Sequence, residues 1–285
     1  MNQVYTLRTE HLELSVVPAL GANIVSLRSV PSGREWIWHS PDGPGSLTGA
    51  AECIPTIAPC TVNGRALPDH GEAWTPAWEV DEEAFEKGSI TTSVRLPISG
   101  LELTRSIRLD DGVALFEYRV VNTASEPTPY LWAFHPLFVI ETGDRVELPE
   151  SIRSVRQGVS QGYPELASAA VWNWPEPLPG LRLDVIDSAR RPASYAKLFA
   201  DFSQTTEGWA ALCRGNERVE LRFDPGVIPH LGLWFTNGGW HGFHHMAIEP
   251  TTHMTDSLVD AAADPLAPAG ERRWHFQIVM SRKEL

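Results

Sequence analysis

Four short stretches hold the side chains that could do chemistry. They are "PDHGEAW" with His70, "LWAFHPLF" with His135, "DPGVIPHLGLWF" with Asp224, His230 and Trp234, and "GFHHMAIEPTTH" with Glu249. An imidazole titrates near neutral pH and can give or take a proton, and a carboxylate can accept one. These residue types predict general acid and base catalysis, although a histidine among apolar neighbours, such as His135, is also typical of a hydrogen-bonded core position.

Glu249 has the most unusual sequence context of these residues. The run Met246-Ala247-Ile248 is typical of a buried strand, and alternation places Glu249 on the face of Ala247, just before Pro250. A carboxylate there must be hydrogen-bonded, paired or protonated, because burying it alone costs several kcal/mol. Two interpretations stay open: Glu249 is a general base, or it accepts backbone N–H bonds at a strand end.

The histidines around Glu249 also raise the possibility of a transition-metal site, as in a metal enzyme of the cupin type. The residues concerned are His241, His244, His245 and His253. On one strand, only residues an even number apart share a face, so His244 cannot join His245 and Glu249. We therefore expect no metal, and we keep the cupin-type enzyme as an alternative.

Tryptophan is abundant, with 11 residues in the chain, and Trp74, Trp78, Trp132, Trp234 and Trp240 lie in or beside the four stretches. Indole rings usually belong to the core, but at the mouth of a cleft their flat apolar faces suit the C–H face of a sugar. The sequence thus predicts a carbohydrate site, and scattering of these rings through separate core regions would contradict that prediction.

The elements that position these residues are predicted to be β-strands. "LELTRSIRL" and "VALFEYRVV" alternate apolar and polar residues around an Asp-Gly turn, which is typical of an antiparallel hairpin. "RVELRF" and "WHFQIVM" repeat the alternation, whereas "RRPASYAKLFADFS" allows one short helix at most. We expect a single all-β antiparallel domain over residues 1–285.

Composition excludes several classes of function. The net charge of −13, with no basic run longer than two arginines, argues against nucleic-acid binding and against an anionic membrane surface. No apolar run is long enough for a membrane span, and no signal peptide is visible, so a cytoplasmic protein is expected. The cysteines Cys53, Cys60 and Cys213 form no metal or redox motif, and reduced thiols are expected.

The chain resembles the aldose 1-epimerase, or galactose mutarotase-like, family. The resemblance rests on "GANIVSLRS", "NGRALPDHGEAWTPAW", "AFHPLF" and "MAIEPTT", which occur in the family's order from about Gly21 to Glu249. It implies a large antiparallel β-sandwich, a sugar site on a concave sheet, and interconversion of α and β anomers without metal or cofactor. By the same resemblance Glu249 is the base, His135 the acid, and His70 a hydrogen-bonding partner of the sugar.

Some positions depart from the family pattern. Arg65 follows Gly64, where the family has an arginine before the glycine; Asp201 and Asp224 both compete for the role of the sugar-binding aspartate; and His230 stands where an aromatic residue is expected. No arginine cluster accompanies the motifs, which favours a neutral aldohexose or a related sugar over a sugar phosphate. A non-catalytic sugar-binding or sugar-sensing protein, and an accessory domain of a lyase or hydrolase, remain alternatives, and a monomer or homodimer is expected.

Overall fold

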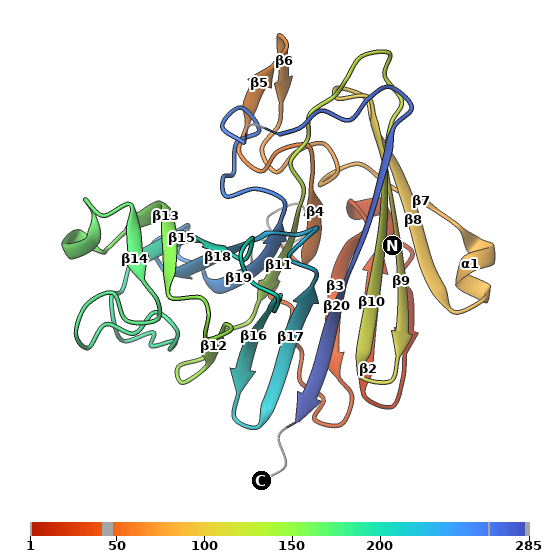
Figure 1. Cartoon of the computed structure of the whole chain (residues 1–285). Helices are drawn as coiled ribbons and strands as arrows, with labels where there is room; N and C mark the ends of the chain where they lie inside the picture. Colours follow the sequence, from red (N-terminus) through yellow and green to blue (C-terminus); the bar gives the residue numbers. More distant parts are fainter. Residues whose placement is uncertain (1, 42–47, 262, 283–285) are drawn as a thin grey trace.

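The computed structural model describes residues 2–41, 48–261 and 263–282, and the regular secondary structure of these residues is almost entirely antiparallel β-strand. Two large sheets pack face to face, so the predicted all-β sandwich is confirmed (Figure 1). In the described part of the chain the larger sheet has ten strands and the smaller has eight. No helix among these residues is long and apolar enough to cross a membrane.

The ten-stranded sheet carries the residues singled out above. Its strands, in spatial order, are β1 (Tyr5–Arg8), β2 (Leu12–Val17), β3 (Asn23–Ser29), β4 (Ala50–Cys53), β11 (Ala133–Phe138), β19 (His244–Thr251), β18 (His230–Asn237), β15 (Ser194–Asp201), β13 (Ser154–Gln161) and β14 (Val171–Asn173). His135 and Glu249 therefore sit on the adjacent central strands β11 and β19.

The eight-stranded sheet covers one face of the larger sheet. Its strands, in spatial order, are β12 (Arg145–Glu147), β16 (Trp209–Arg214), β17 (Glu217–Phe223), β20 (Glu271–Arg282), β10 (Val113–Asn122), β9 (Leu101–Asp110), β8 (Ser89–Leu96) and β7 (Glu79–Val80). The remaining elements are the hairpin β5 (Cys60–Val62) and β6 (Arg65–Leu67), the helix α1 (Glu82–Glu86), and the single 3₁₀ turns η1 (Pro18–Leu20) and η2 (Pro164–Leu166).

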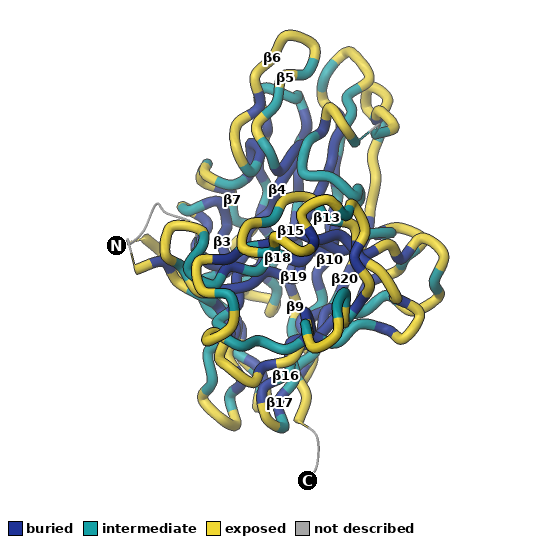
Figure 2. Tube along the Cα trace, turned by 90° about the vertical axis from the view of Figure 1, so that its left-hand side faces the viewer, coloured by how far each residue is buried: buried dark blue, intermediate teal, exposed yellow. Residues whose placement is uncertain are grey.

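Alternation explains most of the second sheet. The predicted hairpin is present as β9 and β10, and its turn places Asp111 at a φ of 50°, in the left-handed region that Asp tolerates. "RVELRF" and "WHFQIVM" form parts of β17 and β20, which pair with each other. Figure 2 shows the buried residues gathered in the middle strands of both sheets, with the exposed residues in the loops around them.

One segment differs from the sequence expectation. "SYAKLFAD", inside the stretch that allowed a short helix, is instead the strand β15, paired with β13 and β18. Ala196, Leu198 and Ala200 face the core, and Lys197 is also buried, so the strand lacks the polar face that reveals a strand by alternation.

Candidate active site

The candidate site is built on the face of the ten-stranded sheet that points away from the second sheet. Inward-facing residues of β18 and β19, such as Leu231, Leu233 and Ile248, belong to the core between the sheets. Alternation therefore places Glu249 and Gly232 on the opposite face. The sheet register pairs Gly232 with Glu249 directly.

The loop that carries His70 is attached by backbone hydrogen bonds to the segment that follows β4. His70 N–H donates to the carbonyl of Ile57 at 2.6 Å, and His70 has a φ of 60°. The next residue must be glycine, because a Cβ on Gly71, whose φ is 75°, would lie 2.3 Å from the carbonyl oxygen of Ile54. Glu72 accepts hydrogen bonds from the backbone N–H groups of Ile98 and Ser99, so this carboxylate holds the loop rather than facing a ligand.

His70 and His135 meet at one side of the site. Their ring centroids are 5.4 Å apart, with the rings nearly perpendicular, and Nδ1 of His70 lies 2.9 Å from a carboxylate oxygen of Asp69. Trp74 packs against both imidazoles, at 4.5 Å from His70 and 5.7 Å from His135. The indole therefore backs the two histidines and limits their movement.

Glu249 is fully buried between two possible proton carriers. Its Oε1 lies 3.4 Å from Nε2 of His135, and its Oε2 forms an ion pair with Nζ of Lys197. Oε1 accepts no hydrogen bond from the described residues. Since buried polar atoms are nearly always satisfied, this orphaned oxygen is a place where a ligand hydroxyl could donate.

Gly232 makes the ion pair possible. Lys197 is paired with Trp234, and Phe199 with Gly232, so Lys197 must reach diagonally over Gly232 to contact Glu249. A Cβ on Gly232 would lie 3.2 Å from Glu249 Oε2 and 3.2 Å from Lys197 Nζ. Even a methyl group at this position would crowd the ion pair, whereas glycine leaves it room.

The electrostatics of the cluster give its members different charge states. Burial lowers the pKa of His135 well below its usual range, and the nearby His70 and Lys197 lower it further, so the imidazole is neutral at pH 7. Burial also disfavours the ammonium of Lys197, but the carboxylates of Asp256 and Glu249 outweigh it and raise the pKa of Lys197. Asp256 Oδ1 lies 3.4 Å from Nζ of Lys197.

A cavity of about 370 Å³ opens over this cluster, a volume typical of a small-molecule site. Its polar lining comes from Asp69, His70, His135, Lys197, His245 and Asp256, and its aromatic lining from Tyr195, Trp234 and Trp240. Glu249 lies beneath Lys197 and His135 and has no exposed surface of its own. The cavity thus has protonatable groups on one side and flat rings on another.

The aromatic wall is a cluster of three contacting rings. Trp234 lies 5.5 Å from Tyr195 and 5.7 Å from Trp240, measured between ring centroids, and Trp240 is 39% exposed. Trp234 Nε1–H donates to Nε2 of His245 at 3.3 Å. Burial lowers the pKa of His245 to about 3, so His245 stays neutral and keeps accepting this hydrogen bond.

Several residues expected to bind the substrate lie elsewhere. Trp78 is a core residue, 4% exposed, with the guanidinium of Arg105 over its ring, so it cannot form a wall of the cleft. Trp74 stands behind the histidines and does not line the cavity, so the aromatic wall is formed by other rings. Trp132 is likewise buried in the core, which leaves the tryptophans divided between core and cavity.

The competing aspartates are also outside the cavity. Asp224 occupies an exposed turn after β17, where its carboxylate accepts the N–H of Gly226. Asp201 lies at the exposed end of β15, 3.4 Å from His230. His230 lines a second cavity of about 610 Å³ that adjoins the first through Asp256, Ala58 and Val159.

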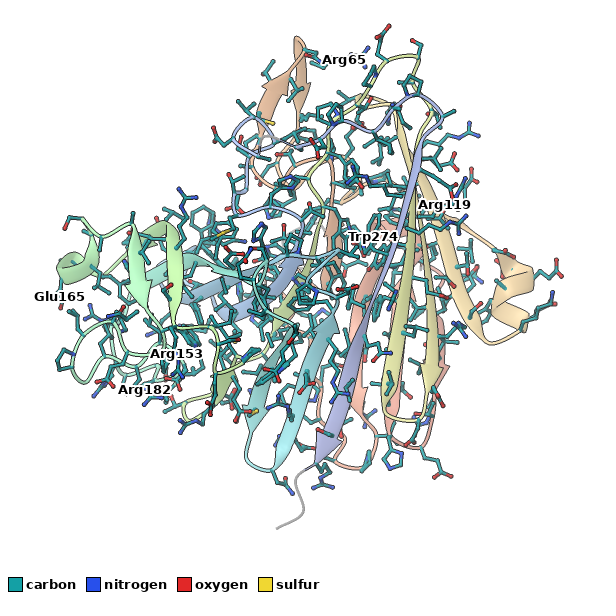
Figure 3. The ribbon with its side chains drawn as sticks, viewed as in Figure 1. Arg65, Arg119, Arg153, Glu165, Arg182 and Trp274 are labelled. Carbon is teal, nitrogen blue, oxygen red and sulfur yellow. The ribbon has the colours of Figure 1, made fainter. Side chains whose placement is uncertain are left out.

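The structure also places Arg65 and the histidines that were considered as metal ligands. Arg65 lies on the projecting hairpin β5–β6, where it donates to the carbonyl of Ile98, away from β18 and β19 (Figure 3). Among the residues that the structure describes, no group of three or more His, Cys, Asp or Glu side chains could hold a metal ion. His244 is exposed beside Asn237, whereas His245 faces the cavity, as the parity argument required.

Sequence reasoning missed Lys197 and Asp256, and it gave no role to Tyr195. Lys197 and Tyr195 belong to β15, the segment for which the sequence suggested at most a short helix, because it lacks the alternation of apolar and polar residues that is typical of a strand. The available clue was Gly232 in the middle of "HLGLWF", because a glycine inside a strand often marks the close approach of another group.

The fold matches solved structures over the full chain. A galactose mutarotase related enzyme from Lactobacillus acidophilus has a TM-score of 0.73 and 17% identity, with 99% of this chain and 100% of that chain covered. A galactose mutarotase-like protein from Lactobacillus casei gives 0.72 and 17%, covering 98% and 100%, and an aldose epimerase homologue from C. elegans gives 0.70 and 11%, covering 100% of both chains. No family model and no curated protein matches the sequence. At these identities the comparisons establish the galactose mutarotase-like fold.

Proposed function

We propose that this protein, which has the galactose mutarotase-like fold, is an isomerase that interconverts the α and β anomers of a free sugar. The observation that carries the proposal is the orphaned Oε1 of buried Glu249, 3.4 Å from His135, under a cavity with an aromatic wall. A base next to proton carriers and a platform for a sugar ring are the parts that this reaction needs.

The reaction requires two proton transfers across the sugar. Glu249 would remove the proton from the anomeric hydroxyl, which would have to reach Oε1 between the cavity-lining residues His135 and Lys197, while an acid delivers a proton to the ring oxygen. The ring then opens, the aldehyde turns about its C1–C2 bond, and the ring closes on the other face. Each positioned transfer contributes about 10²–10⁴-fold to the rate. The resemblance gives His135 the role of acid and gives His70 a hydrogen bond to the sugar.

The cavity favours a neutral sugar such as an aldohexose. Sugar phosphates are usually held by arginines, and within the described residues the lining contains none. Its fixed charges are Lys197 and the carboxylates of Asp69 and Asp256, which would repel a phosphate overall. Tyr195, Trp234 and Trp240 offer ring faces for the C–H side of the sugar.

Polarimetry tests the proposal directly. The optical rotation of freshly dissolved α-D-glucose and α-D-galactose is followed with wild-type protein and with the variant Glu249→Gln, and Glu220→Gln, a buried carboxylate of the other sheet, is the control. We expect wild-type and Glu220→Gln to accelerate mutarotation, and Glu249→Gln to lose about 10²-fold or more of the rate. Equal rates for wild-type and Glu249→Gln would refute Glu249 as the base.

A sugar-binding or sugar-sensing protein is the second candidate, and one observation favours it. The ammonium of Lys197 occupies Oε2 of Glu249, and the carboxylate has no exposed surface. Binding without turnover would appear as a saturable change in tryptophan fluorescence with no acceleration of mutarotation. Trp234 and Trp240 line the cavity and would report such binding.

A further inference from the structure

Lys197 is a buried cation at the centre of the candidate site. Its side chain is 4% exposed, it lines the cavity, and it contacts the carboxylates of both Glu249 and Asp256. Taking an ammonium out of water costs several kcal/mol, and replacing a whole buried ion pair by apolar residues is often neutral or stabilising, so stability alone gives no reason for a Lys197–Glu249 pair. The position therefore calls for a chemical explanation.

We propose that Lys197 is the proton donor of the anomeric interconversion, a role that rests on the function proposed above. Lys197 lines the cavity from β15, and its Nζ contacts the base, so it would lie close to the ring oxygen of a sugar whose anomeric hydroxyl is bound at Glu249. His135 then acts as a neutral hydrogen-bonding partner that orients the substrate.

The charges around Lys197 support this assignment. Glu249 and Asp256 face it from β19 and the segment that follows, Cys53 lies nearby on β4, and His135 is the neighbouring group on β11. The two carboxylates keep the ammonium protonated, whereas a proton placed on His135 would put two cations side by side in a buried site. Of Lys197 and His135, Lys197 is therefore the one that is cationic at pH 7 and can donate the extra proton.

The proton balance closes within the ion pair. Glu249 takes the proton of the anomeric hydroxyl, the C1–O1 double bond forms, the C1–O5 bond breaks, and O5 takes a proton from the ammonium of Lys197. The carboxylate and the ammonium become a carboxylic acid and an amine, so the buried site loses both charges together. The amine of Lys197 and the carboxylic acid of Glu249 remain next to each other, at the positions of the present ion pair, while the aldehyde turns about its C1–C2 bond. Ring closure on the other face reverses the same transfers.

Variants of the two possible donors distinguish their roles. Lys197→Arg keeps the cation beside Glu249 and Asp256, but a guanidinium does not release its proton at physiological pH. We expect its kcat to fall by about 10²-fold or more, with KM changed by less than about tenfold. Lys197→Met should lose as much, and His135→Gln should lose less than about tenfold in kcat. Thermal unfolding followed by circular dichroism tests whether each variant is folded. Tryptophan fluorescence tests whether each variant still binds the sugar.

The pH profile gives a second, independent measure. With Lys197 as donor, the background-corrected kcat of the wild-type protein should stay constant from pH 6.5 to 9, because the raised pKa of Lys197 keeps its ammonium protonated over this range. The pKa of His135 is lowered, so His135 does not change its charge there. With His135 as the donor, kcat would fall about tenfold for each pH unit across the same range.

The outcomes separate the two proposals. A wild-type protein that accelerates mutarotation, with Lys197→Arg inactive and His135→Gln active, supports Lys197 as the donor. An active Lys197→Arg beside an inactive Glu249→Gln and His135→Gln overturns Lys197 and leaves the proposed function standing. A wild-type protein that binds sugars without accelerating mutarotation overturns both.

Discussion

Replacing Lys197 by Met should destabilise the protein more than replacing Glu249 by Gln, and the double variant should recover much of the loss. Lys197→Met leaves a carboxylate without exposed surface, whose Oε1 lies 3.4 Å from Nε2 of His135. Stranding one partner of a buried ion pair costs about 3–5 kcal/mol. In Glu249→Gln, Lys197 keeps Asp256 at 3.4 Å and the new amide oxygen can still accept its proton, so the cost is about 1–3 kcal/mol.

The double variant removes both charges of the pair. Asp256 then loses Lys197, but its side chain is 30% exposed and can be hydrated. We therefore expect the double variant to be more stable than Lys197→Met alone, with a coupling energy of about 2 kcal/mol. Urea unfolding at pH 7.5, followed by fluorescence, measures the four free energies of unfolding. Costs that simply add in the double variant would show that the two side chains do not form a buried pair.

Two further perturbations follow from the same cluster. His245 is neutral in the folded state because burial lowers its pKa to about 3, whereas in the unfolded chain it gains a proton below about pH 6.5. The free energy of unfolding should therefore decrease by about 2 kcal/mol as the pH is lowered from 6.5 to 5. In His245→Gln, urea titration should show a decrease that is smaller by this amount. Parallel losses in both proteins would contradict the buried neutral state. Gly232→Ala places a methyl group 3.2 Å from Glu249 and Lys197. By displacing this ion pair it should lower kcat in the polarimetric assay at least tenfold, while the free energy of unfolding changes by only about 1 kcal/mol. An unchanged kcat would show that the geometry of the ion pair is not critical.

Where one face of a strand is apolar and the other is solvated, the sequence was sufficient to predict the element. β9 and β10 follow this rule, and the Asp-Gly turn between them fixed their register. Within β9, however, Arg105 faces the core together with the apolar residues, where it pairs with Glu52 of the other sheet at 3.0 Å. A partner 53 positions away leaves no mark in the local pattern, so this ion pair could not be predicted.

The candidate site was predictable to the extent that its motifs are local. His135 and Glu249 come from strands that pair with each other, and His70 from a loop whose glycine is required sterically. The aromatic wall was only partly predictable, because the same indole ring serves equally well in the core. Trp78 lies in the core under Arg105, whereas Trp234 lines the cavity.

Lys197 escaped prediction because its meaning depends on three strands at once. It lies on β15, the space it crosses is created by Gly232 on β18, and the carboxylate it meets is on β19. Each strand alone has a bland interpretation: a lysine in an apolar run, a glycine among leucines, a glutamate before a proline. The register brings them into diagonal contact, and the absent Cβ of Gly232 leaves room for a lysine and a glutamate from non-adjacent strands to form an ion pair. A strand glycine that is cross-strand paired with a buried carboxylate is thus an informative feature, because it leaves space for a residue of the next strand to reach that carboxylate.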